Sequence, residues 1–140
     1  MERGQHSHIC PQSFPVRACG QAGTYLQLYA YRERIQVDGE MIDRESLAAL
    51  VTVVKEAVDA MEAEKKGSPT VFEVETALSF LYFKEKKCDI VVLETGLGGT
   101  LDATNVVKTT VMEMISSIGM DTWSFWAVPS GDRGRIKQVS

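Results

Sequence analysis

A short apolar run that ends in a carboxylate constrains this chain more than any other feature. Residues Ile90–Leu93 are continuously apolar, and Glu94 follows them directly. Such a run is typical of a strand that is covered on both faces of a parallel sheet. Three glycines, Gly96, Gly98 and Gly99, come next. Since open α/β sheets bind ligands at the carboxyl ends of their strands, the pattern predicts an α/β domain with a ligand site here.

A β-hairpin is predicted in the first half of the chain. Residues 34–37 alternate between polar and apolar side chains, Asp38 and Gly39 form a strong two-residue turn signal, and residues 40–42 resume the strand. Residues 109–115 supply another strand candidate after the glycines.

Two helices are predicted between the hairpin and the apolar strand. Asp43 offers an N-cap, and apolar residues then recur at three- and four-residue spacing as far as Gly67. Thr70 and Glu73 have the spacing of a capping box, which starts a second, largely buried helix. Helices that alternate with buried strands favour an α/β architecture.

The segment after the apolar strand has two possible interpretations. A carboxylate at Glu94 can bind Mg²⁺ beside nucleotide phosphates, and Gly96, Gly98 and Gly99 let the backbone approach a ligand closely. Alternatively, the glycines serve only turns, Glu94 is solvated and Asp102 caps a short helix. The glycine spacing does not match Gly-x-Gly-x-x-Gly, so the loop alone does not identify a nucleotide site.

Composition excludes some partners. The 140 residues fit one domain, and 15 Lys and Arg against 19 Asp and Glu give a net charge of -4. This charge favours neither a nucleic acid nor an anionic membrane as partner. No apolar run is long enough to span a bilayer, and residues 1–10 lack the apolar centre of a secretion signal, so we expect a cytoplasmic protein. Three irregularly spaced cysteines favour reduced thiols.

Several motifs together resemble one enzyme family. Residues 93–105 read Leu-Glu-Thr-Gly-Leu-Gly-Gly-Thr-Leu-Asp-Ala-Thr-Asn. They resemble the E-x-G-L-G-G-[R]-L-D-A-T-N motif of folylpolyglutamate and dihydrofolate synthases, members of the Mur ligase superfamily. Residues 29–35 are similar to the family's Y-x-E-R-I segment, 67–73 to its S-P-T-x-F-E segment and 117–121 to its I-G-x-D segment. The resemblance covers residues 28–121. It implies an incomplete P-loop-type parallel sheet with helices on both faces, a fragment of an ATP-binding domain.

The resemblance also implies roles for particular residues. Glu94 matches a carboxylate that binds Mg²⁺, and Thr70, Phe72 and Asp102 match positions beside the pterin of the substrate. Each of these three has a structural alternative: Thr70 as a helix cap, Phe72 as a core residue and Asp102 as a loop brace. Thr100 stands where the family usually has Arg.

The implied activity is that of an ATP-dependent acid–amino-acid ligase. ATP and Mg²⁺ activate a carboxylate of folate or dihydropteroate as an acyl phosphate, which the amine of L-glutamate attacks to form an amide. The family's phosphate-binding loop, G-T-N-G-K-G-S, is absent from this sequence, so we expect the chain itself to be inactive. We also expect it to be a monomer. Two alternatives remain open: a non-catalytic binding or structural remnant, and another Mur-type amino-acid ligase.

The family pattern stops near both ends of the sequence. A shifted reading frame would restore Asn-Gly-Lys-Gly-Ser-Thr near the start and Asp-His-Met-Glu-Phe-Leu near the end. We therefore expect residues 1–27 and 122–140 to be out-of-frame, and residues 28–121 to be the domain fragment. A sheet without its neighbouring strands leaves apolar edges uncovered, which predicts poor solubility.

Overall fold

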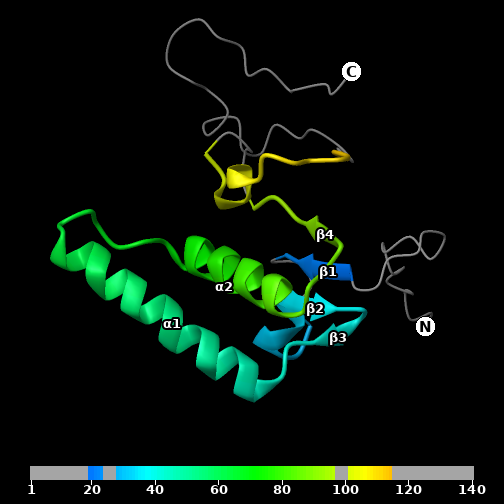
Figure 1. Ribbon diagram of the computed structural model, residues 1–140, viewed down its shortest axis with the longest axis horizontal. Helices are drawn as coiled ribbons and strands as arrows, with labels where there is room; N and C mark the ends of the chain where they lie inside the picture. Colours follow the sequence, from blue (N-terminus) through cyan, green and yellow to red (C-terminus); the bar gives the residue numbers. More distant parts are fainter. Residues whose placement is uncertain (1–18, 24–27, 97–100, 115–140) are drawn as a thin grey trace, which may run out of the picture. The chain divides into compact units, whose positions relative to one another are not determined.

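The computed structural model describes residues 19–23, 28–96 and 101–114 (Figure 1). These residues fall into two units, one ending at Glu94 and one beginning at Thr95. The first unit holds the long helices and the sheet, and the second holds a short 3-10 helix, η2, at Ala103–Val106. No helix among these residues has the length and apolar character needed to cross a membrane.

The first unit is built on a four-stranded sheet in the order β3-β2-β1-β4. The strands are β1 (Cys19–Ala22), β2 (Ile35–Val37), β3 (Glu40–Met41) and β4 (Ile90–Leu93). β1 pairs parallel with β4 and antiparallel with β2. The α/β class and the incomplete sheet are thus confirmed, but the sheet is mixed because the hairpin adds antiparallel pairs.

The predicted hairpin is confirmed as β2 and β3. Asp38 and Gly39 at its turn have φ values of 53° and 83°. Two consecutive positive φ values suit a turn whose twist matches that of the paired strands. The turn is also tied to β1, since the amide of Cys19 donates to Asp38 Oδ1 at 2.8 Å and the amide of Asp38 donates to the Cys19 carbonyl at 2.9 Å.

Strand β1 was not predicted, because residues 1–27 show no strand periodicity. Its backbone is held from both sides, with Gly20 opposite Val37 in β2 and opposite Val91 in β4. Pairing with two neighbours overrides a weak local preference for strand. Cys19, expected to be a reduced thiol, is disulfide-bonded in the structure, whereas Cys88 is free.

Two expectations about strands are wrong. Residues 109–114 form no strand, and their large apolar side chains are exposed, with Val111 at 94%. Strand β4 is not covered on both faces, since Ile90 and Val91 are 37% and 38% exposed. The shared reason is that a strand needs partners, and no described strand lies beyond β4.

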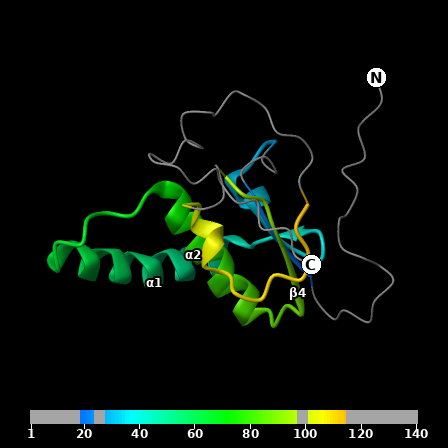
Figure 2. The same cartoon turned by 90° about the horizontal axis from the view of Figure 1, so that it is seen from above.

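Both predicted helices are confirmed with their caps. Helix α1 (Arg44–Ala63) begins after Asp43, whose Oδ1 accepts the Ser46 amide at 2.6 Å. Helix α2 (Val71–Glu85) begins after Thr70, where the predicted capping box is present. In Figures 1 and 2, α2 lies between α1 and the strands.

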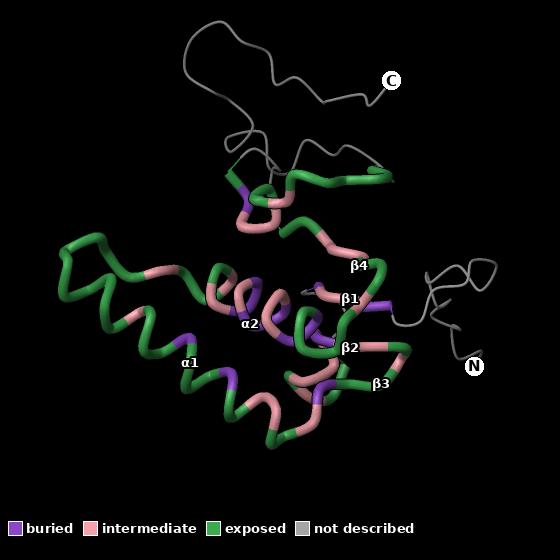
Figure 3. Tube along the Cα trace, viewed as in Figure 1, coloured by how far each residue is buried: buried purple, intermediate pink, exposed green. Residues whose placement is uncertain are grey.

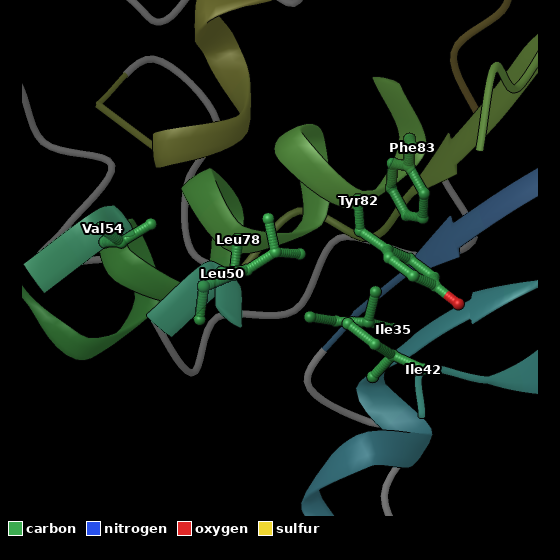
Figure 4. Close-up of a cluster of buried hydrophobic side chains, with 7 residues drawn as sticks. All are labelled: Ile35, Ile42, Leu50, Val54, Leu78, Tyr82 and Phe83. Atoms are coloured by element: carbon green, nitrogen blue, oxygen red, sulfur yellow. The ribbon is translucent and has the colours of Figure 1, made fainter. Parts of the chain in front are cut away.

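One apolar cluster joins these helices to the sheet. Figure 4 shows its members: Ile35, Ile42, Leu50, Val54, Leu78, Tyr82 and Phe83. A Cβ at Gly20 would lie 2.6 Å from the Phe83 ring, so the glycine lets α2 approach β1 closely. Figure 3 shows the buried positions concentrated on α2, while most of α1 is exposed. Since both described helices join this cluster, the expected coverage of both sheet faces is not seen among the described residues.

A 3-10 helix, η1 (Tyr31–Arg34), leads into β2. The Glu33 carboxylate accepts the amides of Leu28 at 2.6 Å and Ala30 at 2.8 Å. These backbone hydrogen bonds, that of Leu28 above all, lower the pKa of Glu33. The carboxylate thereby fixes the turn that leads into η1.

An ion pair joins η1 to α2. Arg34 Nη1 lies 2.7 Å from Glu75 Oε1 and 2.9 Å from Oε2, and the Glu75 side chain is only 10% exposed. The Arg34 guanidinium also lies 5.5 Å from the centroid of the Tyr31 ring. Burial, followed by the charge of Glu75, raises the pKa of Tyr31 to about 12. Because Glu75 is buried, the loss of Arg34 would leave its charge uncompensated.

Truncation of the core should destabilise the first unit. Leu78 is 2% exposed, so Leu78→Ala should lower the free energy of unfolding by ~2–5 kcal/mol through lost burial and a residual cavity. Val71, 75% exposed at the start of the same helix, gives the control variant Val71→Ala, which should change stability by less than about 0.5 kcal/mol. Urea unfolding followed by circular dichroism measures both; equal losses would contradict the described core.

Tyr31 should make stability fall at high pH. Its folded-state pKa of about 12 lies above the value of about 10 for an unfolded tyrosine, so its contribution is complete below pH 10 and is lost as the pH rises towards 12. Urea unfolding of the wild type and of Tyr31→Phe across this range should show a smaller loss for the variant. Parallel curves would contradict the environment described for Tyr31.

Candidate functional site

Glu94 lies where the carboxyl ends of two parallel strands meet. Its amide donates to the Ala22 carbonyl at 2.9 Å, which extends the pairing of β4 with β1 by one residue. The Glu94 side chain packs on the backbone of Gly23. A Cβ at Gly23 would lie 2.3 Å from Glu94 Oε2 and 2.7 Å from Glu94 Cβ. The half-buried carboxylate therefore keeps its place because residue 23 has no side chain.

Arg34 connects this edge of the sheet to α2. Its carbonyl accepts the Gly23 amide at 3.1 Å, and its guanidinium pairs with Glu75. One turn before Glu75 along α2, the Phe72 carbonyl accepts the Thr76 hydroxyl at 2.7 Å. A continuous set of contacts thus runs from Glu94 through Arg34 to the first turns of α2.

Thr70 acts as a helix cap. Its Oγ1 accepts the Glu73 amide at 3.3 Å, and Glu73 Oε2 accepts the Thr70 amide at 2.7 Å. The hydrogen bonds from Thr70 lower the pKa of Glu73. The structural alternative for Thr70 is therefore present, and its contact with a pterin stays a prediction.

Phe72 lies in the first turn of α2 and is half-buried. It belongs neither to the buried cluster nor to the partly buried side chains packed on that cluster. Its aromatic ring is therefore not needed to fill the described core, which weakens the structural alternative for Phe72.

Asp102 braces the loop in the second unit. Its Oδ2 accepts the Gly96 amide at 2.9 Å, and its Oδ1 accepts the Thr104 amide at 2.9 Å and the Thr104 hydroxyl at 2.6 Å. It is 9% exposed and caps η2. The brace expected for Asp102 is thus present, and a pterin contact stays a prediction. Gly98 and Gly99 lie outside the described residues.

The described residues contain no group of three or more His, Cys, Asp and Glu side chains that could hold a metal. Mg²⁺ does not need one, since it usually keeps several waters and binds one or two carboxylates together with substrate phosphates. Glu94 fits that mode, and its role as a metal ligand stays a prediction.

Sequence reasoning missed the residues that hold this edge in place. Gly23 and Arg34 carry no local signal of their roles. Glu75 does, because it shares a helical face with Leu78 and Tyr82, and a charge within a buried stripe needs a partner. That signal indicates a buried ion pair but does not identify Arg34.

Two comparisons with known proteins find relatives of one kind, although no protein-family model matches the chain. A dihydrofolate synthase/folylpolyglutamate synthase of Bacillus subtilis is 46% identical over 102 residues, which are 71% of this chain and 24% of that protein. This chain therefore spans about a quarter of that relative's length.

Solved structures of folylpolyglutamate synthases also superpose on this chain. A folylpolyglutamate synthase from Thermotoga maritima superposes with a TM-score of 0.59 at 44% identity, covering 64% of this chain and 21% of that one. A folylpolyglutamate synthase structure in complex with AMPPCP and folate superposes with a TM-score of 0.59 at 31% identity, covering 64% and 22%. The chain therefore contains part of the sequence and fold of the folylpolyglutamate synthase/dihydrofolate synthase family, to which it belongs.

Proposed function

We propose that this chain represents the part of an ATP-dependent ligase that binds Mg²⁺ and the pterin while glutamate is added to folate or dihydropteroate. The position of Glu94 carries the proposal. Its carboxylate is held against Gly23 at the carboxyl edge of the parallel pair β1–β4, where α/β proteins bind their ligands. A similar structure holds both an ATP analogue and folate, which supports the same substrate classes here.

The proposed role of each residue follows from its chemistry. Glu94 offers a hard oxygen ligand to Mg²⁺, which when bound offsets negative charge on the phosphates of ATP. Phe72, half-buried and outside the core, offers an aromatic face to the pterin. Asp102 uses both of its oxygens within its own loop, so it shapes the backbone around Gly96. A backbone approach to the nucleotide at Gly96, Gly98 and Gly99 stays a prediction from the sequence.

The proposed reaction has two balanced steps. The γ-phosphoryl group of ATP passes to the carboxylate of folate or dihydropteroate, which gives ADP and an acyl phosphate. The amine of L-glutamate then attacks the acyl carbon, an amide bond forms, and phosphate and a proton leave. The sequence contains no G-T-N-G-K-G-S motif, so we expect this chain to bind a pterin without completing the reaction. These substrates also favour a cytoplasmic location.

A non-catalytic remnant is the second candidate. Thr70 and Asp102 both have structural partners that account for them without a ligand. If the chain binds neither a pterin nor a divalent cation, this candidate is correct and the ligase proposal fails for the chain itself.

The pterin proposal predicts weak folate binding that depends on Phe72. Isothermal titration of the full chain with folate should show binding, and Phe72→Ala should weaken it by roughly tenfold, as expected for loss of about 1.4 kcal/mol of stacking. The neighbouring Val71→Ala is the matched control, since Val71 is 75% exposed in the same turn. Equal folate affinities for the wild type and both variants would show that Phe72 does not contribute to a pterin site.

The metal proposal predicts that a divalent cation binds beside Gly23. Mn²⁺ can replace Mg²⁺ at oxygen ligands, and it broadens NMR signals of nearby nuclei. The Gly23 amide signal should broaden on addition of Mn²⁺ to the wild type, but not in Glu94→Gln. Glu85→Gln, on the exposed end of α2, is the control and should keep the broadening. Broadening that survives Glu94→Gln would disprove the assignment.

A further inference from the structure

Helix α2 is held to the rest of its unit in two different ways along its length. Its second half carries buried apolar side chains of the cluster in Figure 4, namely Leu78, Tyr82 and Phe83. Its first turn does not belong to that cluster, since Val71 is 75% exposed and Phe72 is half-buried outside it. The buried cluster therefore holds the second half of α2 more firmly than its first turn.

An ion pair supports the first turns of α2. Glu75 follows Phe72 by three positions, so the two side chains lie on the same side of the helix. One nitrogen of Arg34, Nη1, lies 2.7 Å and 2.9 Å from the two carboxylate oxygens of Glu75, whose side chain is 10% exposed. Since a buried carboxylate without its partner is strongly unfavourable, Glu75 keeps this part of α2 next to Arg34.

The backbone of Arg34 contacts the other side of the site. Its carbonyl accepts the amide of Gly23 at 3.1 Å. The side chain of Glu94 rests on Gly23, where an added Cβ would collide with it. Arg34 therefore contacts the support of Glu94 through its backbone and the helix that carries Phe72 through its side chain. A substitution of the side chain changes the second contact and keeps the first.

We propose that Arg34 and Glu75 are positioning residues, which hold Phe72 in a fixed place relative to Glu94. The inference rests on the proposed function, in which Mg²⁺ binds at Glu94 and the pterin stacks on Phe72. Neither Arg34 nor Glu75 needs to touch a ligand, because the pair acts through the first turns of α2. A ring that is already held in place costs less free energy to order when the pterin binds. The pair should thus strengthen pterin binding and leave the metal site at Glu94 intact.

Titrations of the full chain with folate and with Mn²⁺ test this role. In Arg34→Gln the ion pair is lost, so the dissociation constant of folate should rise by roughly tenfold. Mn²⁺ should still broaden the Gly23 amide signal, because the carbonyl of residue 34 still accepts that amide. Arg34→Lys should bind folate nearly as well as the wild type, since a single nitrogen makes both contacts with Glu75 and an ammonium group can replace it.

Two further variants complete the comparison. Glu75→Gln removes the buried charge and keeps the shape of the side chain, so it should fold even if Arg34→Gln does not, and it should weaken folate binding in the same way. Lys55→Gln is the matched control, because it breaks an exposed ion pair with Asp59 on α1 and should leave the folate dissociation constant unchanged. Circular dichroism verifies the fold of each variant.

Amide hydrogen exchange tests the position of the first turn without any ligand. The Val74 amide donates to the Thr70 carbonyl at 3.1 Å at the start of α2. The Lys86 amide donates to the Tyr82 carbonyl at 2.9 Å at its end. In Glu75→Gln the Val74 amide should exchange faster than in the wild type, whereas the exchange of Lys86 should not change. Equal exchange of both amides in the two proteins would overturn the proposal.

The ligand measurements separate this inference from the proposed function. If Arg34→Gln and Glu75→Gln bind folate as well as the wild type does, the pair has no positioning role, and the pterin site itself stands. If Arg34→Gln also loses the Mn²⁺ broadening of Gly23, or if Arg34→Lys binds folate as weakly as Arg34→Gln, the side chain gives general structural support and the proposal is overturned. If the wild type binds neither folate nor Mn²⁺, the proposed function fails, and the positioning role fails with it.

Discussion

The parallel pairing of β1 with β4 is the constraint on which the rest of the first unit depends. β1 occupies the middle of the sheet, so it joins the hairpin on one side to β4 on the other. Because the two strands run in the same direction, Gly23 and Glu94 arrive at the same edge. The absence of a side chain at Gly20 lets the Phe83 ring of α2 lie on this pair, which connects the sheet to the apolar cluster.

Polar contacts then determine what this edge can do. Arg34 holds Gly23 through its carbonyl and α2 through its pair with Glu75, so the carboxylate of Glu94 and the first turns of α2 belong to one connected structure. The proposed site, which would hold a metal and a flat aromatic ring in a fixed relation, would benefit from such support. The Arg34–Glu75 pair also affects the stability of the fold, because the charge of the buried Glu75 would be uncompensated without Arg34.

Several site residues have structural partners as well as proposed ligands. Thr70 caps α2 and Asp102 braces its loop, whatever they contact in a ligand complex. Phe72 differs, because the core does not need its ring. This contrast explains why substitution of Phe72 is informative about binding, whereas substitution of Thr70 or Asp102 changes the fold locally at the same time.

Local signals in the sequence determined the hairpin turn at Asp38 and Gly39 and both helix caps, because each depends on neighbouring residues alone. The apolar run before Glu94 was also recognised as a strand candidate, and it is a strand because β1 pairs with it. Local signals also identified the family through the segment at 93–105. Tertiary structure alone decided that β1 is an interior strand that joins the hairpin to β4, that Glu94 rests on Gly23 and that Arg34 pairs with Glu75. These contacts join residues far apart in the chain, and no local pattern encodes a partner 41 positions away. The strand expected at 109–115 failed for the same reason, since an apolar run becomes a strand only where a partner pairs with its backbone.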